Sequence, residues 1–367
     1  MSESEPMRDA VRIIAEAGVN HNGSQAMARD LIDAAADAGA DAVKFQTFRT
    51  ADLMTRAAPK AVYQKAATEG DSQFDMIAAL ELSVDDHRAL IAHARKRGIV
   101  FMSTPFDHAS LDFLIDDLGV GELKLPSGEV TNGPLLLHAA EKRVPLILST
   151  GMATMDEIAD ALAVIAFGLV GEGAPSLQAF AAAFDSIAGQ VALRESVTLL
   201  HCTTEYPAPL HSVNLRAMDT MAEHFVLPVG YSDHTDGITV AVAAAARGAR
   251  VIEKHLTLDR SLPGPDHQAS ADPATFAEMV KAVRAVEMAL GEETKQPSDV
   301  ELPNMAVARR SLVAKAAIKA GETFSTDNLT AKRPGDGLSP MTYWECLGRT
   351  ASTDYDVDDL ISPGEMD

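Results

Sequence analysis

The chain has 367 residues, of which 47% are hydrophobic, and a formal net charge of −22 at pH 7. This length suits one large α/β domain plus a small second domain with an ample core. The acidic balance argues against nucleic acid as a partner, because phosphates attract a basic surface. No apolar run reaches the roughly 18 residues that span a bilayer, and the polar, acidic start lacks the apolar segment of a secretory signal. A cytoplasmic protein without a membrane or nucleic-acid partner is expected.

Eight apolar segments predict eight β-strands, and polar or charged residues follow each of them. The segments lie within residues 11–17, 42–47, 99–102, 122–126, 144–148, 197–200, 229–235 and 251–255. Helical periodicity separates them, for example over residues 24–38, 83–97 and 239–247. Eight strand–helix units predict a closed (β/α)₈ TIM barrel, with functional residues at the C-terminal ends of the strands. A doubly wound open sheet is the alternative, but residues 18–23 lack the glycine-rich fingerprint of that fold.

Two segments interrupt this pattern. Residues 55–75 separate the second strand from its helix, and we expect them to fold over the barrel mouth. Residues 168–195 extend the fifth helical region, and we interpret them as helix and loop added on the outside of the barrel.

The barrel domain is predicted to span residues 1–290 and to close with a helix over residues 273–290. Residues 291–305 are polar and contain prolines, which is typical of a linker. Residues 306–367 are predicted to form a small β-rich module, with short strands near 311–314, 317–322 and 329–332. The acidic end, residues 354–367, is expected to be a solvated tail.

His234 and His255 follow two successive strands, so their imidazoles can converge on one divalent metal ion. Two histidines and water suit Mn²⁺, Zn²⁺ or Fe²⁺, and oxygen-rich surroundings favour Mn²⁺ or Mg²⁺. The same spacing also suits two histidines that only form hydrogen bonds. His201, His211 and His267 are further candidates, so a histidine count alone does not decide.

Three lysines at strand ends, Lys44, Lys124 and Lys254, predict an anion site. Lysine is rarely buried without a partner, and three at one barrel mouth would bind a carboxylate or phosphate. Hydroxyl groups and backbone N–H groups at equivalent positions would add donors. These positions are Thr104, Ser127, Ser149, Thr150, Gly151 and Ser232. Each hydroxyl could by itself cap a helix or end a strand, but their recurrence favours a site.

Carboxylates near strand ends are candidates to orient a polyol or to act as acid and base. They are Glu16, Glu129, Glu205 and Asp266. Asp266 lies in the sequence PGPDH at residues 263–267, where two prolines would stiffen a loop over the site.

Seven motifs, in the same order, resemble those of the sialic acid synthases. These are nonulosonic acid synthases, which condense phosphoenolpyruvate with an N-acetylated mannose-type sugar. The motifs are IAEAGVNHNG (14–23), KFQ (44–46), STPFD (103–107), PSGE (126–129), YSDHT (231–235), EKH (253–255) and PGPDH (263–267). Residues 329–340, which contain KRPGDG at 332–337, resemble the antifreeze-like (SAF) domain of that family. The likeness covers nearly the whole chain except residues 168–195.

The resemblance implies a role for each matching residue. His234 and His255 would bind Mn²⁺, with Mg²⁺ or Co²⁺ as alternatives. Phosphoenolpyruvate would bind at Lys44, Thr104, Lys124, Ser127, Ser149 and Ser232. The sugar would be surrounded by Glu16, Gln46, Tyr206 and Asp266. Arg333 would enter the active site of a partner subunit in a domain-swapped homodimer, with the linker providing the reach. As a separate hypothesis, not implied by the resemblance, Glu129 would handle a proton or stabilise the cationic centre, and Glu16 is the second catalytic candidate.

The choice of sugar depends on residues 201–209, HCTTEYPAP. This segment lacks the asparagine-containing form of N-acetylmannosamine users and is more similar to the bacterial legionaminic acid synthases. Those enzymes take a 2,4-diacetamido-trideoxy sugar, and Glu205 could accept a hydrogen bond from its additional amide or pair with a nearby lysine. N-acetylneuraminate and a legionaminate both stay open as products.

Two other classes of function compete with this interpretation. A Schiff-base aldolase would use Lys44 or Lys124 as a covalent nucleophile and would need no metal. A non-catalytic sugar- or ice-binding protein is suggested by the terminal module alone, and it leaves eight polar strand ends unexplained.

Overall fold

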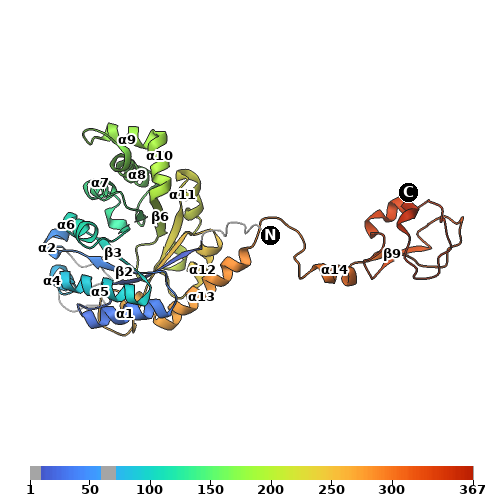
Figure 1. Ribbon diagram of the computed structural model, residues 1–367, viewed down its shortest axis with the longest axis horizontal. Helices are drawn as coiled ribbons and strands as arrows, with labels where there is room; N and C mark the ends of the chain where they lie inside the picture. Colours follow the sequence, from blue (N-terminus) through green and yellow to red (C-terminus); the bar gives the residue numbers. More distant parts are fainter. Residues whose placement is uncertain (1–9, 59–71, 367) are drawn as a thin grey trace. The chain divides into compact units, whose positions relative to one another are not determined.

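The computed structural model describes residues 10–58 and 72–366 of the protein (Figure 1). The chain divides into two compact units, Met1–Gly291 and Glu292–Asp367. Among the described helices, none combines the length and the apolar composition needed to cross a membrane.

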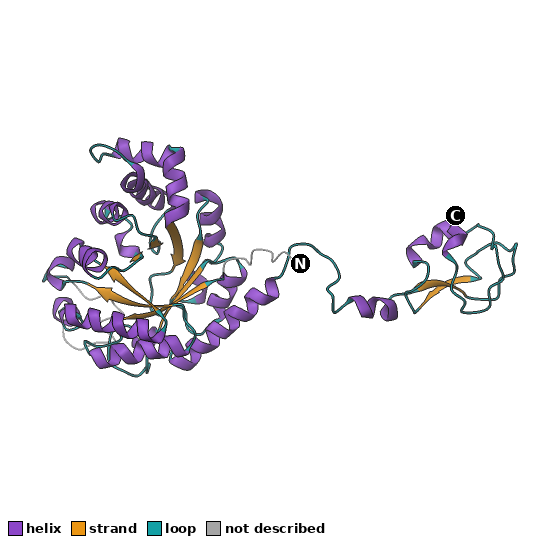
Figure 2. Cartoon of the chain, viewed as in Figure 1, coloured by secondary structure: helices purple, strands orange, loops and turns teal. Residues whose placement is uncertain are grey.

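Eight parallel strands form the sheet of the first unit (Figure 2). They are β1 (Arg12–Gly18), β2 (Ala42–Thr47), β3 (Val100–Pro105), β4 (Leu123–Leu125), β5 (Leu146–Ser149), β6 (Val197–Cys202), β7 (Val229–Asp233) and β8 (Val251–His255). The strand order is β3-β2-β1-β8-β7-β6-β5-β4, and β3 and β4 at its two ends lie side by side. The sheet therefore closes on itself, and the predicted TIM barrel is confirmed.

Helices between the strands surround the barrel. They are α1 (Gln25–Asp37), α2 (Thr50–Leu53), α4 (Gln73–Ala78), α5 (Val84–Arg97), α6 (His108–Asp112), α7 (Gly133–Glu141), α8 (Met155–Val170), α9 (Leu177–Asp185), α10 (Ile187–Ser196), α11 (Ala217–Phe225), α12 (Thr239–Ala246) and α13 (Pro273–Leu290). Local sequence explains several helix ends. Thr154 and Glu157 form a reciprocal capping box that begins α8, and Gly98 ends α5 in the left-handed conformation.

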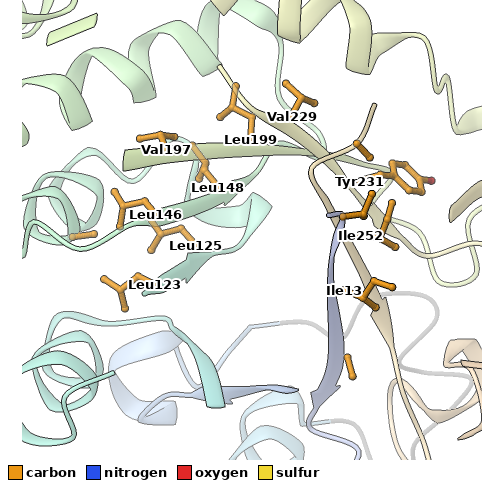
Figure 3. Close-up of a cluster of buried hydrophobic side chains, with 14 of the residues drawn as sticks. Ile13, Leu123, Leu125, Leu146, Leu148, Val197, Leu199, Val229, Tyr231 and Ile252 are labelled. Atoms are coloured by element: carbon orange, nitrogen blue, oxygen red, sulfur yellow. The ribbon is translucent and has the colours of Figure 1, made fainter. Parts of the chain in front are cut away.

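Side chains of each strand alternate between two hydrophobic layers. One set points outward into the core shared with the helices, and Figure 3 shows members such as Ile13, Leu146 and Leu148. The other set forms a separate cluster inside the barrel, built from Ile14, Ala42, Met102, Ile147, Leu200 and Val251. Because successive strand residues face opposite sides, the residue two positions after each inner apolar residue also faces the barrel interior.

The two interruptions of the pattern have different outcomes. Residues 168–195 form the end of α8, all of α9 and most of α10, and α9 and α10 pack on α8 (Figure 1). Of residues 55–75, expected to fold over the barrel mouth, residues 59–71 lie outside the described part of the chain.

The second unit contains α14 (Leu302–Ala308), the antiparallel pair β9 (Ser311–Ala314) and β10 (Leu329–Lys332), and α15 (Tyr343–Cys346). The predicted linker over 291–305 therefore includes the start of α14. No third strand forms over the described residues 317–322, where Ile318 makes a single bridge to Tyr355.

The expectation of a solvated acidic tail is wrong. Ile361 is fully buried in the core of the second unit, and its N–H donates to the Leu312 carbonyl at 3.0 Å. The Tyr355 hydroxyl donates to the Glu365 carboxylate at 2.7 Å. A small unit has few apolar residues, so the isolated ones in an acidic segment are recruited to its core.

Candidate active site

A cavity of about 270 Å³ opens at the C-terminal ends of the barrel strands. All eight strands or the loops that follow them contribute to its lining. Of the candidate residues, the structure brings together Glu16, Lys44, Gln46, Thr104, Lys124, Ser127, Ser149, Tyr206, Ser232, His234, His255 and Asp266. Among the candidates of the first unit, Glu129, Thr150, Gly151, Glu205 and Lys254 are absent from the lining residues.

The alternation of strand residues explains why polar side chains reach this cavity. Glu16 follows Ile14 by two positions and Lys44 follows Ala42 by two, so both continue the inner face of their strands. Thr104, Ser149 and Glu253 stand in the same relation to Met102, Ile147 and Val251. The barrel interior is therefore an apolar layer with a polar layer directly above it.

Four charged side chains form a compact network at the floor of the cavity. Lys44 pairs with Glu16 and lies 3.6 Å from Glu253, while Lys124 lies 3.3 Å from Glu253. Each of the four side chains is at most 6% exposed. The Lys44 ammonium also donates to the Thr104 hydroxyl at 3.1 Å, and the Ser232 hydroxyl donates to Glu253 at 2.8 Å. Two positive and two negative charges are thus balanced without solvent.

Burial and neighbouring charges separate the pKa values in this network. Burial raises the pKa of Glu16 to about 7, although the Lys44 ammonium opposes this. Burial acts in the same direction on Glu253, but Lys124 and Lys44 outweigh it and hold the pKa of that carboxyl well below its usual range. Burial lowers the pKa of Lys124. At neutral pH Glu253 is therefore an anion, whereas Glu16 can gain or lose a proton.

His234 and His255 lie near each other at the ends of β7 and β8, with ring centroids 5.7 Å apart. His234 Nδ1 is 2.7 Å from the Thr203 carbonyl oxygen. A carbonyl only accepts, so we assign the proton to Nδ1, which leaves Nε2 unprotonated and 3.4 Å from the Ser232 hydroxyl. Burial lowers the pKa of His234 and, more strongly, of His255, so both rings are neutral.

This histidine pair fits a divalent metal ion. Neutral imidazoles are the form that binds metal, and a hydrogen bond from Nδ1 to a carbonyl is the usual way to orient such a ligand. His255 Nδ1 is buried and has no hydrogen-bond partner among the described residues. The part of the chain that the structure describes holds no group of three or more His, Cys, Asp or Glu arranged as metal ligands. Water or substrate would have to complete the coordination.

The remaining candidates surround these two groups. The Tyr206 ring lies against His234, with ring centroids 4.3 Å apart. The Ser127 hydroxyl accepts from the Gly151 backbone N–H at 2.9 Å, and a Cβ on Gly151 would come within 2.4 Å of the Thr204 hydroxyl. Only glycine at position 151 therefore lets the loop after β5 approach Ser127 and Thr204 this closely. Burial raises the pKa of Asp266 to about 6.

Several sequence-based assignments do not survive. Lys254 is not part of the anion site: it points to the other side of β8 from His255 and pairs with Asp233 at 2.8 Å. The Thr150 hydroxyl donates to the Leu200 carbonyl at 3.0 Å and has a structural role. Glu205 is exposed and is absent from the lining residues.

Glu129 lies outside the cavity lining. The Glu129 carboxylate accepts from the Asn132 side chain at 2.6 Å, in the turn that begins α7. Arg333 follows β10 in the second unit.

Sequence reasoning also missed residues that the structure places in the cavity. Glu253 carried no assigned role, although it precedes His255 by two positions and so must share its face of β8. Six apolar lining residues likewise carried no assigned role, although Val19 and Phe106 lie within the motifs IAEAGVNHNG and STPFD. They are Val19, Phe48, Leu53, Ile77, Phe106 and Met152.

Comparisons with known proteins identify the family. Residues 31–295 match the NeuB family and residues 309–363 match the SAF domain. The chain is 48% identical to the N,N'-diacetyllegionaminic acid synthase of Campylobacter jejuni, covering 95% of this chain and 98% of that one. It is 47% identical to the protein of the same name from Legionella pneumophila, covering 93% and 90%.

A solved structure is similar as well. The N-acetylneuraminic acid (sialic acid) synthetase from Leptospira borgpetersenii, in complex with citrate, aligns with a TM-score of 0.66 at 31% identity. The alignment covers 81% of this chain and 90% of that one. The chain belongs to the NeuB family and carries a C-terminal SAF domain.

Proposed function

We propose that this enzyme condenses phosphoenolpyruvate with 2,4-diacetamido-2,4,6-trideoxymannose and water to give N,N'-diacetyllegionaminate and phosphate. The observation that carries this proposal is the near-full-length identity of 48% and 47% to two synthases named for that product. The cavity supports it, because a buried pair of lysines and a pair of neutral histidines line one space. N-acetylmannosamine, giving N-acetylneuraminate, is the competing sugar.

The charged floor suits phosphoenolpyruvate. Its carboxylate and phosphate need cationic and hydroxyl donors, which Lys44, Lys124, Ser127, Ser149 and Ser232 offer around one cavity. In the absence of substrate Glu253 lies within ion-pair distance of both lysines. An incoming anion would compete with Glu253 for the ammonium groups.

The reaction builds charge that these residues can stabilise. C3 of phosphoenolpyruvate forms a bond to the aldehyde carbon of the open-chain sugar, and positive charge develops at C2. The aldehyde oxygen takes up a proton and becomes a hydroxyl group. Water adds to C2 and gives up one proton. The bond between C2 and the phosphate oxygen then breaks, and the second proton of the added water is lost as the C2 carbonyl forms and phosphate leaves. Fixed charges in a buried site stabilise such changes more strongly than water does.

Proton transfer is the role that we propose for Glu16. Its pKa of about 7 lets it accept or donate a proton at neutral pH. Glu129 is a poorer candidate, since its carboxylate is engaged with Asn132 and does not line the cavity.

His234 and His255 would hold a divalent cation, with Mn²⁺ favoured and Mg²⁺ or Co²⁺ as alternatives. When bound, such an ion polarises the sugar aldehyde as a Lewis acid. The two rings contribute unprotonated nitrogens, and the Thr203 carbonyl orients His234.

We further propose a domain-swapped homodimer in the cytoplasm, where phosphoenolpyruvate is available. Arg333 would then reach the cavity of the partner subunit. In support, the second unit exposes large apolar side chains, with Met341 79% and Trp344 72% exposed. Surfaces of this kind mark interaction sites. Arg333→Ala should lower turnover without changing the mass of the dimer in solution.

The test is phosphate release from phosphoenolpyruvate with each sugar, before and after treatment with EDTA. We expect release with the trideoxy sugar, loss of activity in EDTA, and recovery on adding Mn²⁺. Release with no acetamido sugar would refute the synthase. Full activity after complete metal removal would refute the histidine metal site.

One observation favours the Schiff-base alternative: burial lowers the pKa of Lys124, and a nucleophilic lysine must lose its proton. Borohydride would then trap pyruvate covalently on Lys124. A protein of unchanged mass after borohydride and pyruvate, together with phosphate release in the first assay, excludes this route.

A further inference from the structure

Besides its main core, the barrel unit contains a separate hydrophobic cluster beyond the ends of β1, β2 and β3. Val19, Phe48 and Phe106 follow these strands, and Leu53 and Ile77 come from α2 and α4. All five also line the cavity, and we call them the apolar arc. The Phe48 and Phe106 rings pack edge to face, with centroids 6.1 Å apart.

The apolar arc differs in chemistry from the rest of the lining. The floor carries four charged side chains, and the loops after β6, β7 and β8 carry Tyr206, His234 and Asp266. The side chains of the apolar arc contain no hydrogen-bond donor or acceptor. A hydroxyl group held against the arc would lose its bonds to water and gain none. A methyl group in the same place would bury apolar surface favourably.

The charges of phosphoenolpyruvate belong to the lysine-lined floor, which leaves the arc to the uncharged substrate. Two apolar groups distinguish the trideoxy sugar from N-acetylmannosamine: the C6 methyl and the methyl of the second acetamido group. The acetamido methyl brings an amide whose N–H and C=O need partners, which the arc lacks. The C6 methyl is attached directly to the carbon chain and has no such requirement.

We propose that the apolar arc receives the C6 methyl group of a 6-deoxy sugar and thereby sets the preference of the enzyme for 6-deoxy over 6-hydroxy acetamido sugars. This inference rests on the proposed function and deepens it. It assigns the preference to the loops after β1–β3 and not to Glu205, which is exposed and outside the lining.

The experiment measures kcat/KM for phosphate release with four sugars. They are N-acetylmannosamine, its 6-deoxy form, 2,4-diacetamido-2,4-dideoxymannose and its 6-deoxy form. These four sugars vary the substituent at C4 and the substituent at C6 independently of each other. We expect the 6-deoxy sugar of each pair to be favoured roughly 10-fold or more, the usual range for one apolar group in a fitted pocket.

Two variants then place a hydroxyl in the arc. Phe106→Tyr adds one to the ring, and Ile77→Thr introduces one while shortening the side chain by one methyl group. Each should lower the 6-deoxy to 6-hydroxy ratio several-fold, chiefly through KM. Met152→Gln is the matched control, because Met152 lines the same cavity from the loop after β5. In Met152→Gln, the ratio of kcat/KM for 6-deoxy over 6-hydroxy sugars should equal that of the wild type. Circular dichroism checks that all three variants fold.

The outcomes separate the two proposals. Release with none of the four sugars would overturn the synthase itself. Release with equal kcat/KM for 6-deoxy and 6-hydroxy sugars would overturn the arc and leave the synthase standing. So would a ratio that neither folded arc variant changes, or one that Met152→Gln lowers as much as Ile77→Thr does.

Discussion

Two adjacent layers inside the barrel use the same strands for different purposes. The lower layer is the apolar cluster that includes Ile14, Met102 and Ile147. The upper layer, two residues further along each strand, contains charged groups such as Lys44 and Glu253. Both layers are almost completely buried. The lower layer gains stability from burial, whereas the upper layer needs ion pairs to offset its desolvation.

In this barrel, the residues that stabilise the fold and the residues that carry the chemistry are therefore only two positions apart on the same strands. Removing atoms from the lower layer should destabilise the fold and leave the chemistry of folded molecules intact. Removing a charge from the upper layer should abolish activity, and its effect on stability should depend on the charge left behind. The predictions below test that separation, from the largest expected effect to the smallest.

Lys124→Met should reduce kcat/KM for phosphate release roughly 10²–10³-fold, since it removes a fixed charge that faces the substrate anion. It should also cost about 3 kcal/mol of stability, because Glu253 loses the partner at 3.3 Å. Adding Glu253→Gln should recover much of that stability by restoring charge balance, with activity still lost. Denaturant unfolding and initial-rate kinetics measure the two effects separately. If the double variant Lys124→Met/Glu253→Gln recovered activity, the proposal that the charges of the upper layer are needed for activity would be contradicted.

Ile147→Ala should destabilise the barrel unit by roughly 3 kcal/mol, the usual cost of such a cavity in a packed core. Ile147 is 2% exposed and belongs to the lower layer. At a temperature where the variant is fully folded, kcat should stay within about twofold of the wild type. A large fall in kcat at full folding would show that the layers are coupled.

The pH dependence of sugar use should reflect Asp266, whose pKa burial raises to about 6. A carboxylate accepts hydrogen bonds from sugar hydroxyl groups, and this capacity is present above pH 6 and is lost as the pH falls through 6. At pH 5 roughly a tenth of the enzyme would hold Asp266 ionised, so kcat/KM for the sugar should drop about 10-fold. Asp266→Asn should have lower activity at pH 8 and should lack this drop. If Asp266→Asn retained the pH profile of the wild type, a group other than Asp266 would be responsible for the titration.

Glu129→Gln should change phosphate release by less than about twofold, because the Glu129 side chain does not line the cavity and is engaged with Asn132. The glutamine can still accept from Asn132, as the carboxylate does at 2.6 Å. Steady-state kinetics with saturating phosphoenolpyruvate is sufficient. A loss comparable to that of Lys124→Met would return Glu129 to the active site.

Much of the site was predictable because strand patterns carry local information. The pattern of apolar segments placed Lys44, Lys124 and His255 at strand ends, and all three line the cavity. The exclusion of Lys254 was also within reach. It is adjacent to His255, and neighbouring strand residues face opposite sides, so the two cannot both point inward.

Other features had no local signal. Glu129 lies in the turn after β4, where strand alternation does not apply, and its contact with Asn132 turns it away from the lining. The apolar arc joins residues from α2 and α4 to residues after β1–β3. Its members look like ordinary core residues in the sequence, and only their shared position shows that they face a cavity. Ile361 likewise looked solvated because its neighbours are acidic.

By itself, the sequence determined the eight strand–helix units, the strand-end positions of the chemical groups and the family likeness, because each depends on residues close together in the chain. The tertiary structure alone decided which strand face points inward, how the charges at Glu16, Lys44, Lys124 and Glu253 balance, and which apolar residues border the cavity. The physical reason is that burial and charge pairing act between strands. They arise only when β3 and β4 meet and the barrel closes.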